Sequence, residues 1–174
     1  MTTNNHGLFR HGPTGWSHPN PRRPSTVTMS YELRPHTADV AVAATGADLG
    51  STFAAAADGL ASAACERFPD AGDRFSITVR AEGREALLFD YLDQLIYERD
   101  VRGVLPVDNE ARVTPPGADA DSGADAHGTW NLEGSYRGVP LAGLGARDLK
   151  AVTYSEMELT ETDEGWHAYV VFDV

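Results

Sequence analysis

Residues 49–64 form an alanine-rich segment whose apolar side chains recur at steps of three and four positions. This spacing predicts an amphipathic helix, and Asp48, directly before it, is a good N-cap residue. Alanine combines high helix propensity with a small side chain, so such a helix can lie close to a sheet. The apolar positions are Leu49, Phe53, Ala56, Ala57, Leu60 and Ala64. The segment therefore favours a fold in which a helix packs directly on strands.

A second amphipathic helix is expected over residues 85–98, where leucine, isoleucine and tyrosine share one face. The other apolar segments alternate with polar residues or are rich in β-branched residues, which is typical of strands. They lie at residues 31–34, 40–44, 75–79, 104–113, 130–136, 151–160 and 166–174. The last two predict a hairpin across residues 162–165. We expect an α+β fold, a single domain with two helices packed on one face of a largely antiparallel sheet.

The domain is expected to span residues 31–174. Residues 1–30 contain four prolines and three histidines without apolar periodicity, and are expected to be a disordered tail. The histidines of this tail offer only a weak alternative metal site. Residues 114–128, rich in Pro, Gly, Ala and Asp, are expected to be an acidic surface loop. They do not fit a calcium-binding EF-hand loop, because Gly123 and Trp130 stand where oxygen ligands are needed.

The charge balance limits the partners of the chain. It has 26 acidic residues against 14 basic ones, and residues 1–30 hold three of the bases and no acid. Residues 31–174 therefore carry 26 acids and 11 bases, a net charge of −15. Such a surface repels phosphate backbones, so direct nucleic-acid binding is not expected. An acidic shell of this kind is typical of proteins from salt-loving organisms.

The cysteine content and the lengths of the apolar runs indicate the cellular compartment of the protein. The single cysteine, Cys65, cannot form an internal disulfide, which agrees with a reducing environment. No apolar run approaches the roughly 20 residues that a membrane-spanning helix needs, and the first thirty residues lack the apolar centre of a secretory signal. We expect a cytoplasmic protein that does not contact a membrane.

Three separated groups can form a site. His36 and Asp39 lie between two strands, Lys150 is the only lysine, and Asp173 and Val174 end the sequence. Hard cations prefer carboxylate and carbonyl oxygens, which Asp39, Asp173 and Val174 can supply together if the fold brings them to one sheet edge. The alternatives are that Asp173 is a solvated strand end, that His36 is a turn histidine, and that Lys150 only extends along the surface.

Motifs of catalysis are sparse. The chain has no phosphate-binding P-loop, no zinc-binding spacing of Cys and His, and no nucleophile elbow. A set of His36, Asp39 and Ser155 can be imagined, but only the residue types support it. The residues by themselves therefore predict an acidic α+β domain with a cation site built from oxygen ligands.

Several segments together resemble the archease family over residues 31–174. The sequence HTADV at residues 36–40 resembles the opening motif of the family, and LKAVTY at residues 149–154 resembles a late one. The two predicted helices lie where the family places its helices, and VFDV at residues 171–174 is similar to its typical ending. One departure is Ser155, because the family usually has a histidine there.

The resemblance implies a non-enzymatic protein that helps the RtcB-type tRNA-splicing ligase become guanylylated and turn over repeatedly. A divalent cation, calcium by expectation with magnesium or manganese as alternatives, would be held by Asp39, Asp173 and Val174. Lys150 would be a functional base, and His36 a further functional residue. Two other classes stay open: a small metal-dependent hydrolase and a chaperone-like accessory protein.

Overall fold

The computed structural model describes residues 29–35, 39–118 and 128–174 of the 174-residue chain. Nearly all of the expected tail, His36 and most of the expected acidic loop lie outside the described residues. The elements, in chain order, are β1 (Ser30–Pro35), β2 (Asp39–Gly46), α1 (Leu49–Ala64), β3 (Asp73–Ala81), α2 (Arg84–Arg102), β4 (Val104–Thr114), β5 (Trp130–Pro140), β6 (Ala151–Thr162) and β7 (Gly165–Asp173).

The strands pair antiparallel in two sheets. One sheet has the order β1-β2-β7-β6 and the other has the order β3-β5-β4. The expected α+β class, the two helices, the antiparallel pairing and the β6–β7 hairpin are confirmed. The structure differs from the expectation in one respect, because the strands form two sheets and not the single sheet that was expected to carry both helices on one face.

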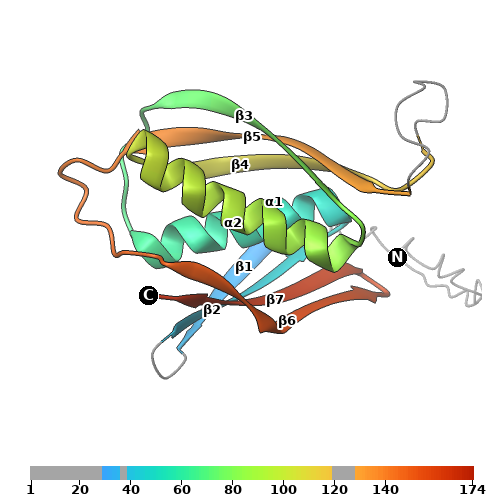
Figure 1. Cartoon of the computed structure of the whole chain (residues 1–174). Coiled ribbons are helices and arrows are strands. Elements are labelled where there is room, and N and C mark those ends of the chain that lie inside the picture. The colour runs from blue at the N-terminus through green and yellow to red at the C-terminus, as the bar shows by residue number, and fades with distance from the viewer. Residues whose placement is uncertain (1–28, 36–38, 119–127) are drawn as a thin grey trace, which may run out of the picture.

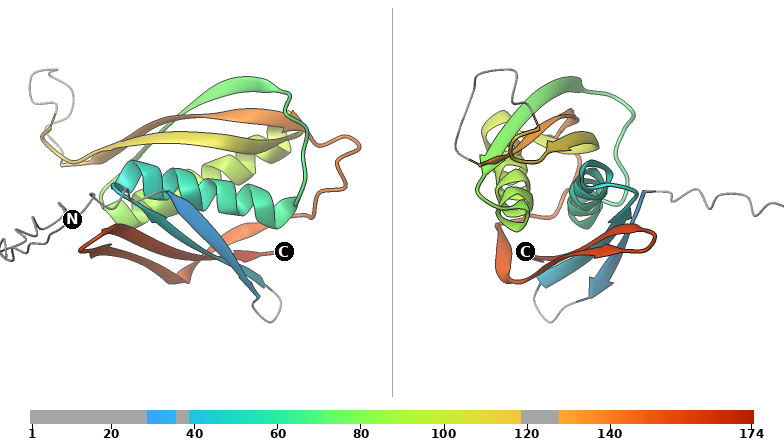
Figure 2. Two further views of the ribbon diagram at one scale, coloured as in Figure 1. Left: turned by 180° about the vertical axis from the view of Figure 1, so that it is seen from behind. Right: turned by 90° about the vertical axis from the view of Figure 1, so that its right-hand side faces the viewer.

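The two helices lie between the sheets (Figure 1). The end-on view in Figure 2 shows the helices side by side, with the three-stranded sheet on one side and the four-stranded sheet on the other. Helix α1 contacts β1, β2 and β7 of one sheet and β4 of the other. Because α1 separates β2 from β4, these strands cannot join one continuous sheet.

Burial on both sides explains the composition of α1. Its buried residues extend beyond the predicted stripe and include Ala54, Ala55 and Ala61. Two of its glycines mark the closest approaches: a Cβ at Gly50 would lie 2.4 Å from the backbone oxygen of Ala111, and one at Gly59 would lie 2.4 Å from Cγ1 of Val42. Small side chains therefore allow one helix to pack against two sheets.

The first helix begins at its expected N-cap, whereas the second extends to Arg102, beyond the expected end at residue 98. The Asp48 side chain accepts a hydrogen bond of 2.7 Å from the backbone N–H of Ser51, as expected of an N-cap. Helix α2 ends at Gly103, whose φ of 65° is the left-handed conformation that glycine adopts readily. No helix in the described part of the chain is long and apolar enough to cross a membrane.

The contact between Gly59 and Val42 can be tested by a double-mutant cycle. Gly59→Ala should lower the free energy of unfolding by about 1–3 kcal/mol because the new methyl group overpacks the helix–sheet contact. This loss should occur although alanine gains about 1 kcal/mol in helix propensity over glycine. Introducing Val42→Ala as well should relieve the clash, so that the double variant is more stable than the sum of the single effects predicts. Additive effects in chemical denaturation would contradict the packing described here.

Candidate metal centre

The fold brings the start of β2 and the end of β7 together. Asp39 and Asp173 are direct partners in the antiparallel register, and Ala151, the first residue of β6, is the partner of Asp173 on its other side. Figure 1 shows the end of β7 at the same end of the sheet as the start of β2. The two aspartates, 134 positions apart in the sequence, are therefore neighbours.

The two aspartates project from the same face of the sheet. Side chains alternate along a strand, and directly opposed residues on neighbouring strands share a face. Val42 faces α1, so Asp39, three positions earlier, lies on the face turned away from the helices. Asp39 is half-buried and Asp173 is exposed. Like charges placed directly opposite each other are destabilising, so this arrangement favours a positive group nearby.

Lys150 supplies one such positive group. Its backbone N–H donates to the backbone oxygen of Asp173 at 2.9 Å. Its Nζ donates to the backbone oxygen of Val174 at 3.2 Å. The lysine is thus held at the end of β7 by both its backbone and its side chain.

The donor atoms fit a hard cation in type. Ca²⁺ and Mg²⁺ prefer carboxylate and carbonyl oxygens, and Asp39, Asp173 and Val174 offer both kinds. Across the described residues, however, no group of three or more His, Cys, Asp or Glu side chains is placed to hold a metal ion. A cation here would thus rely on two carboxylates and backbone oxygen, with its remaining ligands from water or a partner.

The other predicted site residues differ in their placement. His36 lies outside the described residues. Ser155 is exposed, within the stretch between Thr153 and Glu158 where the β6–β7 register shifts. Of the imagined catalytic set, the structure therefore describes Asp39 at the end of the sheet and Ser155 in the irregular part of β6.

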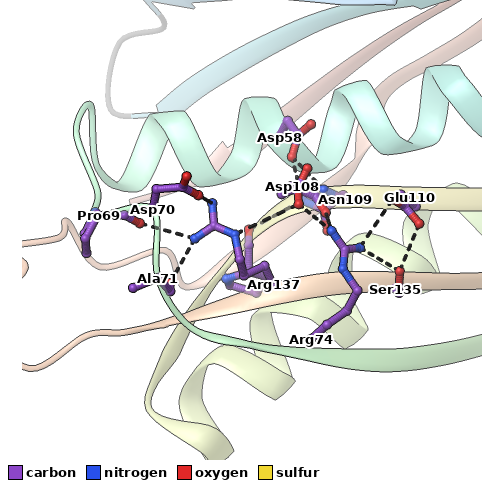
Figure 3. A network of polar contacts seen from close by, with 11 residues as sticks. Asp58, Pro69, Asp70, Ala71, Arg74, Asp108, Asn109, Glu110, Ser135 and Arg137 are labelled. Atoms are coloured by element: carbon purple, nitrogen blue, oxygen red, sulfur yellow. Dashed lines mark hydrogen bonds and ion pairs between the residues drawn. The ribbon is translucent and has the colours of Figure 1, made fainter.

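A second polar cluster, which the sequence did not indicate, lies on the three-stranded sheet (Figure 3). Asp108 has a positive φ of 54° and stands in an irregular part of β4, where the register shifts between Val107 and Glu110. Arg74 forms an ion pair with Asp108, and Arg137 donates to the backbone oxygen of Ala71 at 2.8 Å. The arginines of this cluster are therefore engaged within the protein, which favours a structural role.

The irregular part of β4 is also tied to α1. Oδ1 of Asp58 accepts from the backbone N–H of Asn109 at 3.1 Å and from its side-chain Nδ2 at 2.8 Å. Burial raises the pKa of the Asp58 carboxyl above its ordinary value of 3.8, although the hydrogen bonds from Asn109 act in the opposite direction. A polar residue near the middle of the first predicted helix was the only sequence signal of this contact.

Comparison with known proteins agrees with this architecture. Residues 31–174 match the sequence profile of the Archease protein family. Protein archease of Methanosarcina barkeri is 30% identical over 154 residues, which cover 86% of this chain and 99% of that protein. Protein archease of Pyrococcus furiosus is 26% identical over 149 residues, covering 83% and 98% respectively.

Solved structures show the same fold. The solution structure of protein 1598 of Methanobacterium thermoautotrophicum aligns with a TM-score of 0.66 at 26% identity, over 83% of this chain and 99% of that one. The crystal structure of an archease from Thermotoga maritima, described as a "possible chaperone", aligns with a TM-score of 0.54 at 19% identity, over 90% and 100%.

The fold and the site define a class of small α+β proteins in which two helices lie between two antiparallel sheets and an acidic pair stands at one sheet end. Within that class, the chain belongs to the archease family.

The raised pKa of Asp58 predicts a pH dependence. A carboxyl whose pKa is higher in the folded than in the unfolded state contributes stability that is fully present below its unfolded pKa and is lost as pH rises through its folded pKa. In Asp58→Asn the side chain has no ionisable group, so the variant does not lose this stability as pH rises. The stability of the variant relative to the wild type should therefore increase as pH rises from the ordinary carboxyl value of 3.8 towards neutrality. Urea unfolding of both proteins across this range gives the measurement, and parallel curves would contradict the burial of the charge.

Proposed function

We propose that this protein is an accessory factor of an RtcB-type tRNA-splicing ligase and that it presents a divalent cation at the end of β7. The observation that carries the proposal is the register pairing of Asp39 with Asp173, with Lys150 bonded to Val174 beside it. Membership of the archease family supports the choice of partner.

In this proposal, Asp39, Asp173 and the backbone oxygen of Val174 hold the cation, which we expect to be calcium. When bound, a divalent cation supplies positive charge that can neutralise triphosphate oxygens during guanylylation. The carboxylates orient it on the outer face of the four-stranded sheet, where a partner can complete its coordination. The chain itself breaks no covalent bond and acts by docking on the ligase.

Charge favours such a docking. Residues 31–174 have a net charge of −15, from 26 acids and 11 bases. A ligase that binds RNA needs a positively charged channel, and opposite potentials speed association and orient the partners. The acidic surface thus suits a protein partner with a basic channel better than it suits RNA.

Lys150 has two roles in the proposal. Its ammonium group reduces the repulsion between the aspartates while no cation is bound, and on the ligase it can contact phosphate oxygens. In the isolated protein the lysine also weakens cation binding, because a positive group close to the site repels an incoming cation.

The cation site can be tested with Asp39→Asn, which keeps the size of the side chain and removes its charge. Calcium affinity, measured by titration calorimetry, should fall by roughly tenfold or more, because affinity depends on the number of charged ligands. Stimulation of ligase guanylylation at limiting ligase should fall with it. Asp163→Asn is the matched control, since Asp163 lies in the turn between β6 and β7, at the other end of β7. Unchanged affinity and stimulation in Asp39→Asn would contradict the metal site.

Lys150→Met separates the two roles of the lysine. Removing a positive charge from the site should strengthen calcium binding by the isolated protein about two- to tenfold, given roughly 1 kcal/mol for two charges about 4 Å apart in water. Stimulation of the ligase should nevertheless decrease, because the contact with phosphate is lost. Weaker calcium binding in this variant would show that Lys150 organises the ligands and does not compete with the cation.

A further inference from the structure

Residues 147–150, which we call the strap, connect three parts of the protein. The backbone N–H of Arg147 donates to the backbone oxygen of Ala64, the last residue of α1, at 2.7 Å. Leu149 is 1% exposed and belongs to the hydrophobic core. The strap ends at Lys150, which bonds to both Asp173 and Val174. Its position therefore decides where the lysine lies relative to the two aspartates.

The strap is held from α2 by a buried arginine. The Arg99 side chain is only 7% exposed. Its Nη2 donates to the backbone oxygen of Arg147 at 3.2 Å, and its Nη1 donates to Oδ1 of Asp148 at 3.2 Å. One planar guanidinium thus binds a backbone and a side-chain group of two consecutive strap residues, which fixes the orientation of the segment as well as its distance.

The strap also borders an open space next to the end of α1. A pocket of about 620 Å³ opens there, lined by Gly145 and Arg147 of the β5–β6 connection and by Val40, the neighbour of Asp39. Exposed connections generally move more than the elements they join. The contacts from Arg99 and Leu149 therefore act together with the bond from Arg147 to Ala64 to keep the strap against the domain.

We propose that Arg99 is a positioning residue for the candidate metal centre: by binding Arg147 and Asp148 it holds Lys150 and the end of β7 in the geometry that a cation requires. The cation site is part of the function proposed above, whereas the control of Lys150 by Arg99 rests on the contacts alone. Replacing Arg99 itself would remove a side chain that is only 7% exposed and would endanger the fold, so the test changes its exposed partners.

The chain offers a matched pair of variants. Nη1 of Arg99 also contacts Oδ1 of Asp100 at 2.7 Å, and Asp100 lies next to Arg99 on α2. Asp148 and Asp100 are both exposed, at 73% and 62% of their side-chain surface. Asp148→Asn and Asp100→Asn each remove one negative partner of the same guanidinium, but only the first one weakens the hold on the strap.

The first measurement is amide hydrogen exchange by NMR. In Asp148→Asn the backbone N–H of Lys150 should exchange roughly tenfold faster than in the wild type, because its bond to Asp173 opens more often. In Asp100→Asn this rate should stay near the wild-type value. The amide of Val170, in the middle of β7, reports the global stability and should not differ between the variants. Equal exchange of Lys150 in the two variants would overturn the proposal.

The second measurement is calcium affinity. Asp148→Asn should bind calcium roughly tenfold more weakly than Asp100→Asn, the size of effect that is usual for groups that orient metal ligands. The difference should persist at about 1 M salt, where the interaction of distant charges is screened. A difference that vanishes at high salt would show a charge effect only and overturn the positioning role. If the wild-type protein binds no calcium, the proposed function fails, and the exchange of Lys150 still decides whether Arg99 controls the strap.

Discussion

The antiparallel pairing of β2 with β7 is the contact on which the site depends. It joins the first part of the domain to the last and makes β7 an interior strand, with β2 on one side and β6 on the other. Register is strict where one face of a strand is buried, because a shift by one residue would move every core side chain to the other face. The burial of Val42 and Phe172 in the core therefore also fixes the position of Asp39 opposite Asp173.

The elements of the fold could be predicted because their signals are local. The steps of three and four in α1 and α2 and the alternation in β3 and β5 appear within short windows of sequence. The division into two sheets could not be predicted, because it depends on which strands pair across long distances. In retrospect, the run of Ala54 to Ala57 with Gly50 and Gly59 was informative, since a helix that needs small residues on several faces is covered on several sides.

The site was predictable to a similar extent. The neighbourhood of Asp39, Lys150, Asp173 and Val174 was expected, whereas binding of a cation by them stays a prediction. Arg99 gave no sequence signal, because an arginine on a helix is ordinarily a solvated surface residue. In the structure its buried side chain binds Arg147 and Asp148 of the β5–β6 connection, a tertiary contact. The irregular part of β4 at Asp108 and Asn109 was hidden for the same reason, since its partner Asp58 lies on a different element.

Lys150 and a divalent cation would each reduce the repulsion between Asp39 and Asp173, but in different ways. An ammonium group on a flexible stem donates hydrogen bonds in several directions and can withdraw, whereas a divalent cation demands several oxygen ligands at short range. Two carboxylates and one backbone oxygen fall short of the six to eight ligands that calcium usually takes. An incomplete set of ligands leaves coordination positions that a partner protein can fill. This arrangement suits a protein that presents a cation to a partner better than one that only binds it tightly. The strap then matters because Lys150 can give way to a cation, or reach a phosphate, only from a position that the fold keeps constant.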